Sequence, residues 1–228
     1  MARNIKFAVN EYYHVYNRGV EKRVIYNNKF DYQRFLLLLL LANDSKPIEI
    51  QQLVRDYTIP ELLSQSRTPL VKILAFSLMP NHYHLLLKET TENGIARFMH
   101  KIGTGYSLYF NLQNDRNGRL FQGTYKAKHL TDDRYLKYLF EYIHLNPIRE
   151  KLDEGCQVNS DFLRDIQENP FTSLRAYSGG ERGRLAEAVL DTTDFYTLFT
   201  TLDEHLKRLL QWNKEEFEGG LASLKEAG

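Results

Sequence analysis

The chain has 228 residues, of which 43% are hydrophobic and 26% charged, a composition typical of a soluble globular protein with a buried core. Its single cysteine excludes an internal disulfide and a cysteine-rich zinc site, and it favours a reducing cytoplasm. The longest apolar run, residues 35–42, is far shorter than the roughly 20 residues that span a bilayer. We therefore expect a cytoplasmic protein with no membrane partner and no secretory leader.

Charge is distributed unevenly along the chain. The formal net charge is only +1, which taken alone argues against a nucleic-acid partner. Residues 1–150, however, hold 21 Lys+Arg against 14 Asp+Glu, whereas residues 151–228 hold 9 against 15. Most of the 15 tyrosines also lie in the basic part, where aromatic rings among cations suit base stacking. The split predicts a basic working domain followed by an acidic extension.

The first half of the chain predicts strands, a helix and a long connection. We expect a strand at residues 11–18 and a helix at 31–43 with Asp31 as its N-cap. A hairpin is expected to join strands at 71–78 and 82–88. The polar stretch 44–69 contains three prolines and predicts a long connection, with one short helix near 49–57.

The second half of the chain also predicts both helices and a strand. Helical spacing predicts a helix from residue 94 to about 111, despite two internal glycines, Gly103 and Gly105. We expect a strand at residues 119–130, with Gly123 at a bulge or a close backbone approach. A helix capped by Thr131 or Asp132 is expected at 132–145, and two later helices at 183–200 and 202–218. A turn is expected at residues 179–180. This order predicts an α+β fold with one mainly antiparallel sheet flanked by helices.

Two histidines form the first candidate site. His82 and His84 are two residues apart on a predicted strand, so their side chains share one face of the sheet. Two imidazoles on one face can bind a single metal ion. The alternative is that both are ordinary polar residues on a half-exposed strand.

A tyrosine and an asparagine form the second candidate. Tyr142 and Asn146 are four apart at the end of a predicted helix and therefore share a helical face. A tyrosine hydroxyl beside a metal can attack a phosphodiester, and an amide oxygen can complete the metal shell. Alternatively, Tyr142 belongs to a buried apolar stripe and Asn146 merely ends the helix. Tyr138, one turn earlier, is the reserve nucleophile.

Basic residues around these motifs are candidate phosphate contacts. A cluster of five within 19 residues could equally guard an exposed strand edge. Other cations lie on the preceding helix, on the first strand and after the Tyr142 helix; for His14 a structural role is the alternative. The predicted DNA-binding set is Arg119, Lys126, Lys128, Arg134, Lys137, Arg97, Lys101, Arg149, His14 and Arg18.

Four segments in this order resemble the single-tyrosine (Y1) transposases of the HUH endonuclease superfamily. They are residues 13–19 (YHVYNRG), 79–87 (MPNHYHLLL), 119–126 (RLFQGTYK) and 142–149 (YIHLNPIR). The similarity is greatest to the transposases associated with repetitive extragenic palindromes (REP), relatives of the IS200/IS605-like enzymes. It covers roughly residues 9–152, with a weaker echo at 169–174.

The resemblance implies a fold, a chemistry and a partner. It implies a ferredoxin-like HUH fold in which His82 and His84 bind Mg²⁺ or Mn²⁺ and Tyr142 is the nucleophile. Asn146 stands where related insertion-sequence enzymes carry a third ligand, a glutamine. The expected reaction cleaves single-stranded DNA near a hairpin, leaves a 5′-phosphotyrosine link, and rejoins strands in DNA transposition or recombination.

The resemblance also divides the chain. Residues 1–152 are expected to form the catalytic domain, with 44–69 as an insertion, and 153–228 an acidic, mainly helical extension. A second hypothesis is a domesticated hairpin DNA- or RNA-binding regulator that does not cleave. A third, an unrelated metal hydrolase, lacks an identifiable carboxylate ligand. A nucleoid-associated bacterial protein is expected; whether it forms a homodimer is left open, because both monomers and dimers occur in such families.

Overall fold

The computed structural model describes residues 5–47, 49–149, 152, 154–177, 184–199 and 201–212. The strands are β1 (Tyr12–Arg18), β2 (Val71–Met79), β3 (His82–Glu89) and β4 (Lys126–Leu130). The helices of the first 150 residues are α1 (Lys29–Ala42), α2 (Ile50–Asp56), α3 (Ile59–Ser64), α4 (Gly94–Gln113) and α5 (Asp133–Leu145), with short 3-10 turns η1 (Val20–Lys22) and η2 (Asn146–Ile148). The later helices are α7 (Ser160–Glu168), α8 (Leu174–Tyr177), α9 (Arg184–Val189), α10 (Phe195–Leu198) and α11 (Leu202–Leu209).

The four strands form one sheet in the order β2-β3-β1-β4. Every pairing is antiparallel, because β1 and β2 both run opposite to the β3 strand between them, and β4 runs opposite to β1. With α1 between β1 and β2 and α4 between β3 and β4, this is the β-α-β-β-α-β arrangement of ferredoxin-like folds. The predicted α+β class and mainly antiparallel sheet are confirmed.

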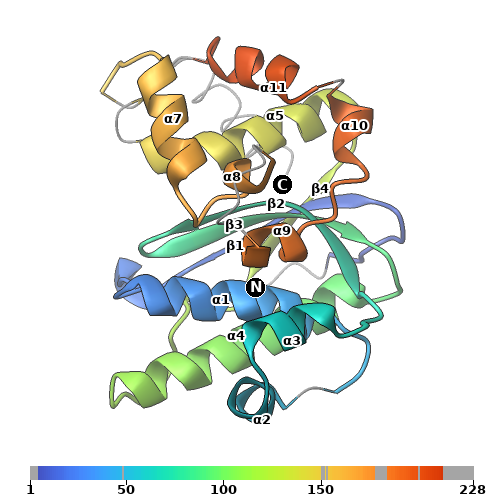
Figure 1. Cartoon of the computed structure of the whole chain (residues 1–228), viewed down its shortest axis with the longest axis vertical. Coiled ribbons are helices and arrows are strands. Elements are labelled where there is room, and N and C mark those ends of the chain that lie inside the picture. The colour runs from blue at the N-terminus through green and yellow to red at the C-terminus, as the bar shows by residue number, and fades with distance from the viewer. Residues whose placement is uncertain are drawn as a thin grey trace.

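Helices cover both faces of the sheet (Figure 1). Helices α1 and α4 lie against one face, and α5 lies against the other, with α7, α10 and α11 around it. The sequence of β3 is a continuous apolar run because the strand is buried on both faces. Leu85 and Leu87 enter the core under α1, whereas Leu86 enters the core under α5. A strand buried on both faces cannot alternate between apolar and polar residues.

Helix α1 begins three residues earlier than predicted. Its N-cap is Asn28, whose side-chain oxygen accepts the backbone N–H groups of Phe30 and Asp31. Asp31 is instead a buried residue of the first turn, and it accepts hydrogen bonds from the Asn27 backbone and the Tyr109 hydroxyl. The predicted N-cap was therefore wrong. Asn28 and Asp31 are both good capping residues, and the helix begins at the earlier one.

Other boundaries also differ from the predicted ones. The connection 44–69 holds two short helices, and the second starts with a reciprocal Thr58–Glu61 capping box. Strand β4 covers only the last part of 119–130, and the predicted helix 183–200 is divided between α9 and α10. The turn at 179–180 and the end of the helix predicted over 202–218 lie outside the described residues. Within the described part of the chain, no helix is long and apolar enough to cross a membrane.

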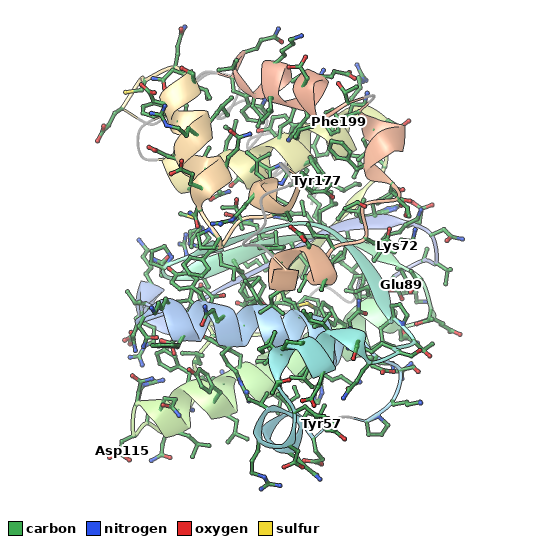
Figure 2. All side chains as sticks on the ribbon, in the orientation of Figure 1. Tyr57, Lys72, Glu89, Asp115, Tyr177 and Phe199 are labelled. Atoms are coloured by element: carbon green, nitrogen blue, oxygen red, sulfur yellow. The ribbon has the colours of Figure 1, made fainter. Side chains whose placement is uncertain are left out.

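The C-terminal extension packs on the outer side of α5. Glu141, only 3% exposed, accepts hydrogen bonds from Arg208 and from the Trp212 indole. The His144 imidazole, one turn further on, bonds to His205 at 3.0 Å and to the Ser173 hydroxyl at 2.7 Å. Phe199, labelled in Figure 2, adds an apolar contact to α5. The extension thus fixes α5 through both polar and apolar contacts.

Acidic residues of the extension also pair with cations of the sheet. Asp194 lies 2.9 Å from the Lys88 ammonium and 3.4 Å from that of Lys72, and it accepts a bond from the Tyr12 hydroxyl. Asp191 lies 3.4 Å from Lys72, which Figure 2 shows beside the segment leading to α10. Part of the charge asymmetry between the two halves is therefore neutralised within the fold.

Replacing Glu141 tests whether the extension stabilises α5. We expect Glu141→Ala to lower the free energy of unfolding by about 3 kcal/mol, because it leaves a buried indole N–H and a guanidinium without their acceptor. Urea unfolding followed by circular dichroism measures this. The control is Glu92→Ala at an exposed position, which should change stability by less than about 0.5 kcal/mol. Equal effects of the two substitutions would contradict a stabilising role of the extension at α5.

The Asp194 cluster predicts a pH dependence. Burial would raise the pKa of Asp194, but hydrogen bonds from Lys88 and Tyr12 outweigh it and hold the pKa below its usual value. The carboxylate therefore stabilises the fold above its unfolded pKa of about 3.9, and this contribution disappears as pH falls through the lower folded pKa.

We expect the difference in stability between the natural chain and Asp194→Asn to be largest near about pH 7 and to narrow towards about pH 3. Urea unfolding at both pH values measures it. Asp161→Asn removes an exposed pair with Arg164 and should show no such trend. A gap for Asp194→Asn that is constant with pH would refute the assignment.

Candidate active site

The antiparallel register of β1 and β3 assembles the centre of the site. It places His84 opposite Tyr16 and His82 opposite Arg18. Directly paired residues point to the same side of a sheet, which here is the side covered by α5. The rings of His82 and His84 lie 5.1 Å apart, centroid to centroid, at nearly a right angle. The predicted pairing of these two side chains on one face is present.

Asn146 brings an amide group to the same place. It is fully buried in η2, at the end of α5, and neither its oxygen nor its nitrogen has a hydrogen-bond partner in the described structure. The Nδ1–H of His82 donates to the side-chain oxygen of Asn81 at 2.6 Å, whereas its buried Nε2 also has no partner. The amide lies close enough to favour the protonated form of His82, although the pair does not reach hydrogen-bond geometry.

These unpartnered atoms fit a metal ion. A buried polar atom without a partner costs roughly 1–3 kcal/mol, which coordination would remove. The Nε2 atom of His82, the oxygen of Asn146 and Nε2 of His84 would supply three donors and leave positions open for phosphate oxygens. Among the described residues, no three His, Cys, Asp or Glu side chains gather into a metal site, so the amide is needed to complete this one.

His14 is positioned to orient one of these ligands. Its imidazole is 5% exposed, and its Nε2 lies 2.8 Å from Nδ1 of His84. Such a bond fixes the orientation and tautomer of a ligating histidine and leaves Nε2 for the metal. The structure thus places His14 behind His84, and DNA contact by His14 stays a prediction.

Burial keeps all three imidazoles neutral. Loss of hydration lowers the pKa of His14 to about 3 and of His82 to about 4, and it lowers the pKa of His84 well below the usual value. The nearby cations Arg18 and Arg149 lower the pKa of His82 and His84 further. Neutral imidazole is the form that binds a metal.

Tyr142 lies directly beside the histidines. Its ring centroid is 5.6 Å from that of His84 and 6.3 Å from that of His14, both edge to face. Tyr138 stacks on Tyr142 at 6.4 Å, on the side where it contacts Trp212 of the extension at 4.9 Å. The register of α5 therefore favours Tyr142 over Tyr138 as the residue next to the candidate metal site. Tyr142 is only 2% exposed.

Four of the predicted DNA-contacting cations surround the site. Arg18 and Arg149 act electrostatically on both histidines, and Lys128 acts on His14. Lys126 pairs with Tyr16 across β1 and β4, which places it on the same face. This basic rim is suited to phosphate groups approaching the histidines.

The remaining candidates lie elsewhere. Arg134 is exposed in the first turn of α5, Lys137 lies over the Phe199 ring, and Arg119 is exposed in the segment before β4. Arg97 and Lys101 are on α4, across the sheet, where they donate to backbone carbonyls of residues 44–46. These two side chains hold the start of the long connection; DNA contact by them stays a prediction.

Sequence reasoning missed two residues of the site. Tyr16 stacks on His14 and on His84, with centroids 4.7 and 5.6 Å away. Asn81 holds His82 through its side-chain oxygen. The two-residue period from His14 to Tyr16 was the signal for the first, whereas Asn81 occupies a hairpin turn and its contact depends on the local backbone.

Comparison with known proteins supports the resemblance. Residues 49–146 match the profile of the family described as "Transposase IS200 like". No curated protein was found to match the sequence. A solved structure described as "Structure of the REP associates tyrosine transposase bound to a REP hairpin" aligns at 11% identity with a TM-score of 0.49, over 80% of this chain and 86% of that chain.

The matched segment contains two of the four motifs on which the resemblance was based, residues 79–87 and 119–126, and the first part of a third, 142–146. It spans both histidines of β3, the whole of α5 with Tyr142, and Asn146. The part of the chain that carries the candidate active site is therefore similar to the IS200-like transposase family.

Proposed function

We propose that the protein is a metal-dependent enzyme that cleaves and rejoins single-stranded DNA through Tyr142. The observation that carries this proposal is the contact of the Tyr142 ring with His84, next to the unpartnered buried atoms of His82 and Asn146. A nucleophile beside a site for a divalent cation is the arrangement that phosphoryl transfer requires. The presence of these residues within an IS200-like transposase segment supports the same chemistry.

The reaction is a transesterification. The Tyr142 hydroxyl loses its proton and its oxygen attacks the phosphorus, forming a 5′-phosphotyrosine while the bond to the 3′ oxygen breaks and leaves a 3′-OH. A 3′-OH can attack that link in the reverse direction, so the number of phosphodiester bonds is conserved and no nucleotide cofactor is consumed. A bound Mg²⁺ or Mn²⁺ would polarise the phosphate oxygens.

The protein residues have distinct tasks in this proposal. His82, His84 and Asn146 would hold the cation, and His14 would orient His84 through the 2.8 Å bond. Arg18 and Arg149 would bind the phosphate whose charge grows in the transition state. Because Tyr142 is almost fully buried, the DNA strand must displace neighbouring side chains before the hydroxyl is reached.

Hairpin-bearing single-stranded DNA is the proposed substrate. The basic rim of Arg18, Lys126, Lys128 and Arg149 supports a nucleic-acid strand, and the requirement for a hairpin rests on the resemblance of the motifs. A non-cleaving hairpin-binding regulator would use the same rim without Tyr142. The buried atoms of His82 and Asn146 that have no hydrogen-bond partner favour the metal-dependent enzyme over the non-cleaving regulator.

Substitution of the tyrosine tests the chemistry. With a single-stranded hairpin DNA and Mn²⁺, the natural chain should form a covalent protein–DNA adduct visible on a denaturing gel, and Tyr142→Phe should form none, because the ring stays but the nucleophile is lost. Tyr138→Phe is the matched control on the same helix and should retain the adduct. An adduct with Tyr142→Phe would exclude this residue as the nucleophile.

Metal affinity tests the ligand set independently of cleavage. We expect His14→Ala to weaken Mn²⁺ binding by about 10–100-fold, because the supporting bond to His84 is lost, and Asn146→Ala to weaken it as well. Isothermal titration calorimetry measures this. The control is His129→Ala, which replaces an exposed histidine of β4 that pairs with Glu11. This variant should bind Mn²⁺ with unchanged affinity. Unaltered affinity in both site variants would rule out the proposed metal centre.

A further inference from the structure

A cavity of about 660 Å³ lies on the opposite side of the sheet from the histidines. It is open to solvent and is lined by α4 and by the segment that precedes β4, and its volume is within the roughly 300–1,000 Å³ typical of ligand pockets. The lining residues used below are Asn17, Tyr83, Thr104, Ser107, Arg119 and Tyr125.

The cavity shares its wall with the candidate active site. Tyr83 stands between His82 and His84 on β3, and Asn17 stands between Tyr16 and Arg18 on β1. Because side chains alternate along a strand, these two residues face the cavity while their neighbours face the metal site. One pair of strands therefore supports both sites from its two faces.

The segment before β4 forms one wall of the cavity and continues the hydrogen bonding of the sheet. Phe121 forms an isolated bridge with Gly19, and the Gln122 backbone donates to the Arg18 carbonyl at 2.9 Å. The Asn17 amide donates to the Gly123 carbonyl at 3.0 Å. These bonds hold the sequence RLFQGTYK, which begins at Arg119, against the ends of the active-site strands.

Glycine leaves the cavity open at two positions. A Cβ added at Gly103, in the interior of α4, would meet nothing within 4 Å, and the same holds at Gly123. By contrast, a Cβ at Gly105 would lie 3.0 Å from the Leu38 side chain, so packing explains that glycine. Glycine inside a helix costs about 1 kcal/mol relative to alanine, and nothing in the packing around Gly103 requires it.

The lining suits a planar, negatively charged ligand. Arg119 is exposed and has no ion-pair partner among the described residues, and no carboxylate lines the cavity. Thr104 and Ser107 supply hydroxyl groups, and the half-buried Tyr125 supplies aromatic surface. A cation, hydrogen-bonding hydroxyls and aromatic rings together are the means by which proteins bind an unpaired nucleotide.

We propose that this cavity receives one unpaired nucleotide of the same DNA strand that enters the active site, on the other side of the sheet from the phosphodiester to be cleaved. The inference rests on the proposed function. The strand would cross the sheet edge at β4, passing from Lys126 on the histidine face to Arg119 at the cavity. The cavity thereby fixes the position of the strand relative to Tyr142.

Filling the cavity tests this assignment. The probe is a fluorescein-labelled single-stranded DNA pool of random sequence, about 20 nucleotides long, bound to chains that also carry Tyr142→Phe to prevent cleavage. We expect Gly103→Leu to raise the Kd about tenfold in fluorescence anisotropy, since stacking of the base is lost. Gln113→Leu adds the same side chain to an exposed position of α4 and should leave the Kd unchanged. Circular dichroism confirms that both variants keep their helices.

A second variant addresses the charge. Arg119→Gln should reduce the slope of log K against log salt by about 0.7, the amount for one phosphate on a single strand. Unchanged affinity with Gly103→Leu, or an unchanged slope with Arg119→Gln, would overturn the nucleotide site. The two proposals fail separately: an adduct at Tyr142 with unaffected Gly103→Leu binding refutes only the cavity, whereas weakened binding without any adduct refutes only the cleavage chemistry.

Discussion

The packing of α5 on the face of the sheet that carries the histidines is the contact on which the rest of the site depends. The helix buries one stripe against Leu74, Leu86 and Leu130 of the sheet, and Tyr142 belongs to that stripe. Hydrophobic burial therefore places the phenol ring against His84 and the amide of Asn146 beside His82. The same contact removes water from the imidazoles and keeps them neutral. Core packing and assembly of the site are one event.

The acidic extension is part of this arrangement. Arg208 and Trp212 bind Glu141, the residue immediately before Tyr142, and His205 binds His144 on the same helix. A 13-residue helix is only marginally stable alone in water. Its position over the sheet consequently depends on tertiary contacts from both sides, the sheet below and the extension above.

Much of the architecture was predictable because it depends on local pattern. Two-residue alternation identified β1, and two apolar runs joined by a short turn identified the hairpin of β2 and β3. Helical spacing identified α4, and a capping residue at its start identified α5. Boundaries were less predictable. The Asn28 cap of α1 was missed because Asp31 is also a good capping residue, and its real role, accepting a bond from Tyr109 of α4, is a contact between distant segments. Charge alone could not indicate that Arg97 and Lys101 also donate to carbonyls of residues 44–46, because these are contacts between distant segments.

The sequence by itself determined the chemical groups and their local faces. Strand and helix periods set His82 beside His84 and Tyr142 in line with Asn146, because these relations depend only on backbone geometry. Tertiary structure decided which groups meet. The β1–β3 register brought His14 to His84, and α5 brought Tyr142 to both. It also decided that Arg119 lines a cavity behind the histidines. Such contacts between distant segments arise from packing, which no local period encodes.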